Sequence, residues 1–463
     1  MKVADGWVVV EGMNSGEQPT THVVVVGGGF AGVGCARELA GNDAVHVTLI
    51  DRHNYHQFQP LLYQVATSQL SPSDIAFSLR AEFHKAGNVD IKMGEVTAVD
   101  LAAHSVTTAD GNVYAGDVLV LAGGAQANFF DTPGAAEHAF PLYSLRDAER
   151  LRSRIIAVFE ESDTDPSLLE QGALNFVVVG AGATGTELAG ALGDMIRETM
   201  TVEYEDLAVD KAHVYVVDLG HVVLNGFSEK AHEYASKALA KRGVEVRLGT
   251  GVKEVASDHV LLSDGTSIPT RCVVWAGGLM AASLAGASGL GVGRGGRIDV
   301  REDLTVEGAP GVYVAGDIAN IPRADGGPYP QLGSVALQGG RWVGKNILAE
   351  IDGKPRTAFH YHDKGIMAMI GRGAAVAEVG EHRHELHGSI AFAAWLGVHA
   401  ALLSGTRNRI EAFIDWGWDY FSKGRGEQVL DRSGAARIDW GGAVGSDEVE
   451  ALPPTQATEA STT

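Results

Sequence analysis

The chain has 463 residues, of which 45% are hydrophobic and 20% are charged, and its formal net charge is −22. This composition excludes a mostly disordered chain, and the length is enough for two or three domains around a large ligand. The acidic balance excludes nucleic acid as a general partner, because a phosphate backbone is bound by basic side chains. The two cysteines, Cys35 and Cys272, are too few for a disulfide framework or a thiolate metal site, which fits a reducing compartment.

The first 300 residues contain two copies of one strand–helix–strand pattern. The apolar run after His22 ends in glycine, as a buried parallel strand does, and a helix at Phe30–Leu39 and a strand at 45–50 are expected to follow. The same order returns after Asn175 and continues to a strand at 213–217. Further apolar runs that end in glycine begin at Val118, Val273 and Val312. Strands that alternate with helices predict a doubly wound α/β protein.

We therefore predict an α/β fold with two Rossmann-like dinucleotide-binding domains, the second inserted in the first, and a C-terminal membrane-interface or dimerisation region. The expected divisions are a flexible tail at 1–21, a first domain at 22–150 and 295–355, a second domain at 172–290, a C-terminal amphipathic helical region at 356–440, and a disordered tail at 446–463. The first segment lacks a basic region followed by a long apolar core, so it is expected to be a flexible tail and not a signal peptide.

The first copy carries the glycine loop Gly27-x-Gly29-x-x-Gly32 between its strand and its helix. The first glycine permits a tight turn, the second lets backbone N–H groups approach a pyrophosphate, and the third lets the helix pack closely on the strand. Asp51 ends the next strand, where a carboxylate can accept hydrogen bonds from a ribose. The loop is therefore predicted to bind a dinucleotide at the positive end of a helix.

The second copy carries Gly180-x-Gly182-x-x-Gly185, and Asp218 closes its second strand. No arginine follows Asp218 to hold a 2′-phosphate, which the carboxylate would also repel, so NADH is favoured over NADPH. Two such loops in one chain predict one dinucleotide that stays bound and one that exchanges, with hydride passing between them. A third strand ends in Gly316-Asp317, which suits the ribityl and phosphate region of a bound flavin.

With these loops the chain resembles the two-dinucleotide-binding-domain flavoproteins, and within them the type II NADH dehydrogenases, which are single-subunit NADH:quinone oxidoreductases. The narrower resemblance rests on the stretch 56–66 (HQFQPLLYQVA), on 363–372 (DKGIMAMIGR), on Ala394-Trp395-Leu396 with His399, and on Trp418 followed by Arg425-Gly426. These motifs span residues 22 to about 430.

The resemblance implies FAD in the first domain, NADH in the second, and a quinone (menaquinone or ubiquinone) that reaches the flavin from the membrane, without proton pumping. FAD would be held by Gly27, Gly29, Gly32, Asp51, Gly316 and Asp317, and NADH by Gly180, Gly182, Gly185 and Asp218. Three residues would act at the flavin: Glu187 near the nicotinamide, and Gln338 and Lys364 at the isoalloxazine edge that meets the quinone.

The chain departs from the family at one position of the quinone pocket. The family pattern there is Ala-Gln-x-Ala-x-Gln, and here Ser334 replaces the first glutamine while Gln338 keeps the second. The shorter side chain removes an amide that could bond a quinone carbonyl. Another glutamine, Gln331, lies close to Ser334 in the sequence. A smaller departure is Ala183, where the second loop of the family often has proline.

From the residues alone, Glu187 and Lys364 each have two interpretations. Thr184-x-x-Glu187 matches a helix capping box, whereas a carboxylate near a flavin could relay a proton. Lys364 could stabilise an anionic flavin or quinol, or be an ordinary solvated lysine. The resemblance favours the functional role for Glu187. The histidine-rich stretch 382–387 lacks zinc-site spacing, so we predict no metal.

Two amphipathic helices are expected in the C-terminal region. Between Glu385 and Arg407 the chain has no Asp, Glu, Lys or Arg, but alanine, glycine and histidine dilute the run, so a transmembrane helix is disfavoured. The first helix would carry a stripe of Phe392, Trp395, Leu396, His399, Leu402 and Leu403. The second would carry Ile410, Phe413, Ile414, Tyr420 and Phe421 on one face, with Glu411, Asp415 and Asp419 opposite. Such helices suit a membrane surface, and core or homodimer packing stays open.

The leading prediction is an FAD-dependent NADH:quinone oxidoreductase, peripheral on the cytoplasmic face of the cell membrane. An alternative is a soluble NADH-dependent flavoprotein reductase that acts on a redox protein or a small molecule. A third is a flavin-binding signalling protein. A disulfide reductase is disfavoured, because the chain has no suitably placed cysteine pair.

Overall fold

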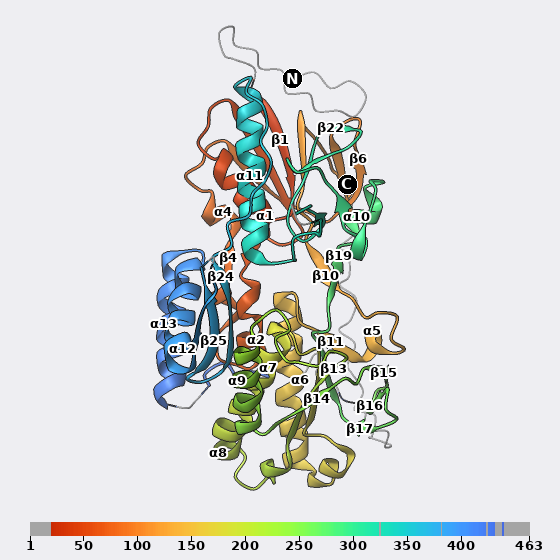
Figure 1. Ribbon diagram of the computed structural model, residues 1–463, viewed down its shortest axis with the longest axis vertical. Coiled ribbons are helices and arrows are strands. Elements are labelled where there is room, and N and C mark those ends of the chain that lie inside the picture. The colour runs from red at the N-terminus through yellow and green to blue at the C-terminus, as the bar shows by residue number, and fades with distance from the viewer. Residues whose placement is uncertain (1–19, 324–325, 381, 423–424, 431–437, 439–463) are drawn as a thin grey trace, which may run out of the picture.

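A computed structural model describes residues 20–323, 326–380, 382–422, 425–430 and 438. The predicted tail at 446–463 and almost all of the predicted tail at 1–21 lie outside these residues. Figure 1 shows two α/β domains stacked along the long axis, with a third unit beside the lower domain. The predicted α/β class with two Rossmann-like domains is confirmed.

The upper domain is built on a six-stranded sheet. Its strands in spatial order are β21 (Thr305–Val306), β22 (Ala309–Val314), β9 (Val118–Leu121), β1 (Thr21–Val26), β2 (Val45–Asp51) and β5 (Val89–Met93). All pairs are parallel except β21 with β22. Helices α1 (Phe30–Leu39) and α11 (Gly333–Ile351) pack against each other beside the sheet (Figure 1). The central strands are continuous apolar runs because they are buried on both faces.

The lower domain has a five-stranded parallel sheet. Its order is β11 (Ala139–Pro141), β18 (Cys272–Trp275), β12 (Asn175–Val179), β13 (His213–Asp218) and β14 (Val244–Leu248). Its main helices are α6 (Leu145–Thr164), α7 (Ala183–Met195) and α9 (Glu229–Lys241). The strands and helices predicted from both glycine-loop copies are thus present, within one or two residues of their predicted ends.

The chain passes between the two domains through an antiparallel pair, β10 (Ala125–Ala127) with β19 (Leu279–Ala281). The predicted first segment, 22–150, therefore runs too far, because β11 and the start of α6 already belong to the lower domain. The three residues of β11 are too short to give a periodic signal, so the sequence pattern did not separate them from the upper domain.

The C-terminal unit begins with a sheet, which the predicted helical region at 356–440 missed. Strands β24 (Gly365–Gly371), β25 (Ala374–Val379) and β26 (His384–His387) pair antiparallel, and helices α12 (Gly388–Leu402) and α13 (Thr406–Ser422) follow. β24 packs on α7 and β25 packs on α12. Because the sheet is covered on both faces, β24 and β25 show no alternation of polar and apolar residues that would have indicated strands.

Smaller elements complete the two domains. The upper domain adds β3 (Tyr55–Gln57), β4 (Ala76–Ser78), α2 (Leu62–Ala66), α3 (Pro72–Ile75), α4 (Leu79–Glu82), β6 (Val96–Asp100), β7 (Ser105–Thr108), β8 (Val113–Ala115), α10 (Leu284–Ala287), β20 (Ile298–Asp299) and β23 (Ala319–Asn320). The lower domain adds α5 (Ala135–His138), α8 (Thr201–Glu203), β15 (Val252–Val255), β16 (His259–Leu262) and β17 (Ser267–Pro269). Although α2 follows β3 in the upper domain, its side chains join the core of the lower domain, so the two domains share packing at this point.

Candidate functional site

The two glycine loops have the same backbone geometry. The first glycine of each has a positive φ, +106° at Gly27 and +107° at Gly180, which favours glycine. A Cβ on the third glycine, Gly32 or Gly185, would collide with the carbonyl oxygen of the first. The first and third positions of each loop therefore require glycine because of the backbone of the protein itself, as the predicted turn and helix-packing roles imply.

The second glycine of each loop differs from the other two. A Cβ on Gly29 or on Gly182 would meet no protein atom within 4 Å. Each of these glycines precedes a helix N-terminus, α1 or α7, and caps it without a side chain. The loops therefore leave open space where backbone N–H groups and a helix dipole face outward, which suits a pyrophosphate.

An acidic residue is fixed beside each loop. Asp51 Oδ2 accepts a 2.6 Å hydrogen bond from Gly28 N–H, and Asp218 Oδ2 accepts a 2.6 Å bond from Ala181 N–H. In each case the other carboxylate oxygen binds a backbone N–H two residues further along, that of His53 or Gly220. The carboxylates are thus held at the strand ends where a ribose would lie.

Gly316 and Asp317 lie next to the first loop, as predicted. Gly316 has a φ of +79°, and a Cβ there would lie 2.9 Å from Ala31 Cβ on α1. Asp317 Oδ2 accepts a hydrogen bond from the Tyr143 hydroxyl at 3.1 Å. Burial raises the pKa of the Asp317 carboxyl, although a small part of its surface stays open to solvent. The open loop and these two carboxylates fit FAD, whose phosphates need N–H donors and whose hydroxyls need acceptors.

Glu187 is buried near the start of α7, the helix that follows the second loop and packs against α2 and β24. Its Oε1 accepts a hydrogen bond from Met369 N–H of β24 at 3.1 Å. The N-cap of α7 is Gly182, without a side-chain bond, so the capping-box alternative for Thr184 and Glu187 is wrong. Burial raises the pKa of Glu187 to about 8, and the hydrogen bond from Met369 opposes that rise. Glu187 is therefore largely neutral at pH 7.

A buried hydrogen-bonded chain next to Glu187 was not singled out from the sequence. Trp416 Nε1–H on α13 donates to Gln64 Oε1 at 2.7 Å, and Gln64 Nε2–H donates to the Tyr63 hydroxyl at 3.0 Å. The Tyr63 hydroxyl in turn lies 3.4 Å from the Met369 sulfur. Both α2 residues fall within the motif at 56–66, but only the fold brings them to Met369 and Trp416. The sequence signal that could have indicated this chain is Gln64, a glutamine among apolar residues, because a buried amide needs hydrogen-bond partners.

A row of rings leads from the first glycine loop to α12. Phe30, directly after Gly29, meets Phe58 edge-on at a centroid distance of 5.6 Å, and Phe58 meets His399 at 6.0 Å. Trp395 stacks on His399 at 3.9 Å. Burial lowers the pKa of His399 to about 4, so the imidazole is neutral at pH 7. Of the predicted α12 stripe, Trp395, His399 and Leu403 are buried, but Leu402 is exposed, which corrects the prediction for that residue.

Gln338 and Lys364 lie near each other but not against Glu187. The Gln338 amide exchanges two 3.0 Å hydrogen bonds with the backbone of His362, two residues before Lys364. Lys364 is exposed directly before β24, whereas Met369, which contacts Glu187, lies five residues further along the chain within that strand. Ser334, the departure from the family pattern, bonds the Tyr361 hydroxyl at 2.8 Å. Both polar groups of this α11 face therefore hold the segment that leads into β24.

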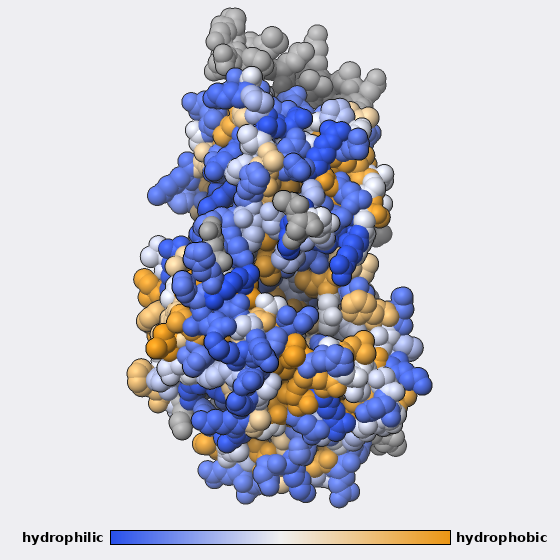
Figure 2. All heavy atoms as spheres, in the orientation of Figure 1, coloured by the Kyte–Doolittle hydropathy of each residue, from blue (hydrophilic) through white to orange (hydrophobic). Residues whose placement is uncertain are grey.

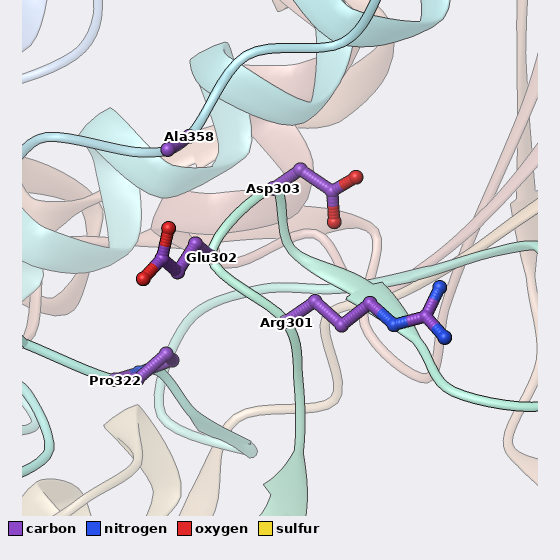
Figure 3. A pocket seen from close by; sticks show the side chains of 5 residues that line it. All are labelled: Arg301, Glu302, Asp303, Pro322 and Ala358. Carbon is purple, nitrogen blue, oxygen red and sulfur yellow. The ribbon is translucent and has the colours of Figure 1, made fainter.

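Two further observations concern other kinds of ligand site. A pocket of about 480 Å³ opens on the upper domain away from both loops, lined by Arg301, Glu302, Asp303, Pro322 and Ala358 (Figure 3). Within the part of the chain that the structure describes, no cluster of three or more His, Cys, Asp or Glu side chains could hold a metal ion.

The fold and site define a flavoprotein oxidoreductase with two dinucleotide-binding domains, and comparison with known proteins agrees. Residues 21–340 match the pyridine nucleotide-disulphide oxidoreductase family. NDH2 from Plasmodium falciparum in complex with NADH superposes with a TM-score of 0.80 at 19% identity, covering 88% of this chain and 99% of that one. A sulfide:quinone oxidoreductase from Aquifex aeolicus gives a TM-score of 0.68 at 18% identity, covering 87% and 96%.

Sequence relatives narrow the assignment. The type II NADH:quinone oxidoreductase Ndh of Mycobacterium tuberculosis is 36% identical over 439 residues, which is 91% of this chain and 93% of that protein. The type II NADH:quinone oxidoreductase of Staphylococcus aureus is 31% identical over 374 residues, 76% and 88% of the two chains. The chain belongs to the type II NADH:quinone oxidoreductases. The predictions of an oxidoreductase that uses FAD and NADH are confirmed.

Proposed function

We propose that this chain takes hydride from NADH, bound at the second glycine loop, and passes two electrons to a membrane quinone through FAD at the first loop, with Glu187 as its proton-carrying group. The observation that carries this proposal is the pair of glycine loops with open space at Gly29 and Gly182, together with the Glu187 carboxyl group that is buried on α7 and bonded to Met369 N–H. Burial raises the pKa of Glu187 to about 8. Such a value suits a group that gives and takes protons near neutral pH. FAD, when bound, accepts the hydride and delivers the electrons.

Each group of residues has a separate task in this proposal. Gly29 and Gly182 leave room for the two pyrophosphates, and Asp51 and Asp218 accept hydrogen bonds from the riboses. Met369 N–H fixes Oε1 of Glu187, and the Trp395 side chain also interacts with this carboxyl group by hydrogen bonding. Gln338 and Lys364 are proposed to lie at the isoalloxazine edge that meets the quinone. The Gln338 amide orients the segment that carries Lys364. The rings from Phe30 to Trp395 form a packed apolar row between the first loop and α12.

Rapid-mixing spectroscopy tests the electron acceptor. NADH should reduce the flavin quickly, and menaquinone or ubiquinone analogues should then reoxidise it quickly. Fast reduction followed by no reoxidation by either quinone would reject the quinone step and favour the soluble reductase. Slow reduction by NADH itself would reject the dinucleotide assignment as well, and would favour a signalling flavoprotein.

Coenzyme choice is expected to depend on Asp218 and Leu219. Leu219 is 72% exposed directly after Asp218. Asp218→Ala combined with Leu219→Arg should weaken NADH binding and strengthen NADPH binding, each by about 10-fold or more. The first change removes the carboxylate that bonds the ribose and repels a 2′-phosphate, and the second adds a guanidinium that pairs with the 2′-phosphate. Steady-state kcat/KM with both coenzymes measures the change. Leu219→Arg alone is the control, since it keeps the carboxylate. An unaltered preference in the double variant would contradict the ribose assignment.

We place the enzyme peripherally on the cytoplasmic face of the membrane, where NADH is available, through an apolar surface on α12 and α13. This surface consists of Ile390, Val398, Leu402, Ile410, Phe413, Ile414, Trp418 and Phe421, each at least 40% exposed. Figures 1 and 2 place apolar residues on the outer flank formed by these helices. Within the described residues, no helix is long and apolar enough to cross a membrane. Aromatic and aliphatic side chains on amphipathic helices suit insertion into a lipid interface.

The packing of α13 supports this orientation. Its buried side consists of Asn408, Ala412, Trp416 and Asp419. Asp419, predicted on the side opposite Phe413, lies 3.3 Å from Arg372 and 3.9 Å from Arg425. Ion pairs and the Trp416 bond to Gln64 thus fix α13 to the body of the protein. Apart from Trp416, the large apolar residues of the helix are left outside, which is the reverse of a helix that packs by its apolar face.

Removing apolar area from this surface should release the protein from lipid. Phe413→Ser with Ile414→Ser and Phe421→Ser is expected to lower partitioning into lipid vesicles about 100-fold or more, since each buried side chain contributes roughly 1.5–3 kcal/mol. Co-sedimentation with vesicles measures it, and Val113→Ser, an exposed apolar residue of β8, is the control. Unchanged sedimentation, with the variant dissociating from dimers to monomers on a sizing column, would assign the surface to a second subunit.

A further inference from the structure

Phe130 is a large apolar residue held at the surface in an unfavourable backbone conformation. Its φ angle is +51° and that of Asp131 is +54°, a region that residues other than glycine seldom occupy. The Phe130 side chain is 60% exposed, so burial of the ring does not stabilise the arrangement. Strained residues persist where the surrounding structure holds them, and they gather at ligand sites.

The loop that carries Phe130 is fixed to the end of strand β18. Asn128 N–H donates to Gly278 O at 3.0 Å, and Trp275 Nε1–H donates to Asn128 O at 2.7 Å. Phe130 N–H donates to Asn128 Oδ1 at 2.9 Å. The neighbouring Phe129 ring packs on Trp275 with a centroid distance of 5.5 Å. Phe130 is therefore presented by a built turn and not by a free loop.

The ring lies beside the second glycine loop. A Cβ on Gly278 would be 2.9 Å from Phe130 Cζ, so the ring lies directly over this glycine. A Cβ on Gly180 would be 2.9 Å from Gly277 Cα, so the segment 276–278 borders the loop itself. Phe130 is thus separated from the second glycine loop by this short segment alone.

The sheet order decides which half of a dinucleotide this ring would meet. β12 precedes the glycine loop, β13 with Asp218 lies on one side of it, and β18 lies on the other. A dinucleotide places its pyrophosphate at the loop and its adenosine ribose at the acidic residue. The other half therefore extends over the end of β18, where Phe130 is held.

We propose that Phe130 packs against the nicotinamide half of the coenzyme and holds it for hydride transfer. This inference rests on the proposed placement of NADH at the second loop. A flat apolar ring in a fixed position removes water from one side of the nicotinamide and restricts its rotation, at little entropic cost because the turn is already formed. The hydrogen bonds of the turn hold Phe130 in this conformation before coenzyme binds, so the contact needs no rearrangement of the loop.

Binding of NAD⁺ and of ADP-ribose to the FAD-loaded full chain tests the proposal. Calorimetric titration should show NAD⁺ binding about five- to tenfold weaker in Phe130→Ala, as expected for loss of one aromatic contact. ADP-ribose lacks the nicotinamide, so its affinity should stay within twofold of the wild type. Val113→Ala, which shortens an exposed apolar side chain on β8, should change neither affinity.

Phe130→Gly separates a ligand contact from a structural role. Glycine tolerates a positive φ, so this variant should melt at the same or a higher temperature than the wild type and still bind NAD⁺ more weakly. Equal weakening of NAD⁺ and ADP-ribose, or unchanged binding of both in the two variants, would overturn the nicotinamide contact while leaving NADH at the second loop. Failure of the wild type to bind either ligand would instead remove the underlying coenzyme assignment.

Discussion

Gly182→Ala is expected to give a folded flavoprotein that retains FAD and binds NADH about 100-fold more weakly. A Cβ at this position meets no protein atom within 4 Å, so the free energy of unfolding of the protein without NADH should not change. The methyl group instead occupies the space in front of the α7 N-terminus and keeps the pyrophosphate from the backbone N–H donors. Losing one or two charge-assisted hydrogen bonds corresponds to roughly 3 kcal/mol. FAD absorbance, thermal unfolding and NAD⁺ titration measure the three consequences.

The other glycines supply matched controls. Gly29→Ala should show the mirror result, a folded chain that purifies without FAD, because the same open space lies before α1. Gly185→Ala should instead lower the free energy of unfolding by about 2–3 kcal/mol, because its Cβ collides with Gly180 O and the helix must shift. If Gly182→Ala lost FAD and Gly29→Ala lost NADH affinity, the assignment of the two loops would be reversed.

Glu187→Gln is expected to lower quinone-dependent turnover about 100-fold while the flavin is still reduced by NADH. Glutamine keeps the size of the side chain and can still accept the bond from Met369 N–H, but it carries no transferable proton, and general acid–base groups typically contribute such factors. Rapid-mixing measurement of the two half-reactions separates the steps. Equal loss in both steps would point to a positioning role and contradict the proton-carrying one.

The pH dependence gives a second readout for Glu187. The neutral acid predominates below its folded-state pKa of about 8, so wild-type turnover that uses this proton should fall as the pH rises through 8, and the variant should lose this transition. In the unfolded chain the group ionises near 4.5. Between these two values the unfolded state releases a proton that the folded state keeps, so the glutamine variant should gain stability relative to wild type across this window.

Asp194 provides the control for Glu187, because it is another buried carboxylate of α7. Its Oδ1 pairs with Arg242 Nε at 2.9 Å, and its Oδ2 accepts a bond from Arg372 N–H at 2.7 Å. Asp194→Asn should therefore lower thermal stability by weakening this ion pair, and it should leave the transition near pH 8 in place. A shift of that transition in the Asn variant would mean that the titrating group is not Glu187.

Most of the dinucleotide-binding framework was readable from short stretches of sequence. The strand, the glycines and the helix of each loop lie within about a dozen residues, and their conformations follow from local sterics: a positive φ at Gly27 and no room for a Cβ at Gly32. Asp51 and Asp218 follow from their places at the end of the next strand. The C-terminal sheet escaped prediction because strands covered on both faces carry no polar–apolar alternation.

The contacts around Glu187 could not be predicted from the sequence, because they form only in the folded chain. Its hydrogen bond joins residues 182 positions apart, and the bond between Gln64 and Trp416 joins residues 352 positions apart, so no local pattern encodes either partner. The capping-box pattern at Thr184 was locally sound, yet Gly182 caps the helix and the carboxyl group turns to β24. Burial of that group, and with it the pKa of about 8, exists only once α2, α7 and β24 have met.

The amino-acid sequence by itself thus determined that this protein has two glycine loops of the dinucleotide-binding kind, each with an acidic residue beside it, because glycine sterics and strand ends are local. The tertiary structure alone decided which side of α13 faces outward. Hydrophobicity would bury Phe413 and expose Asp419, but Arg372 and Arg425 draw Asp419 inward and leave Phe413 at the surface. A buried charged side chain lies next to the opposite charges that pair with it, and only the folded chain brings those distant residues together.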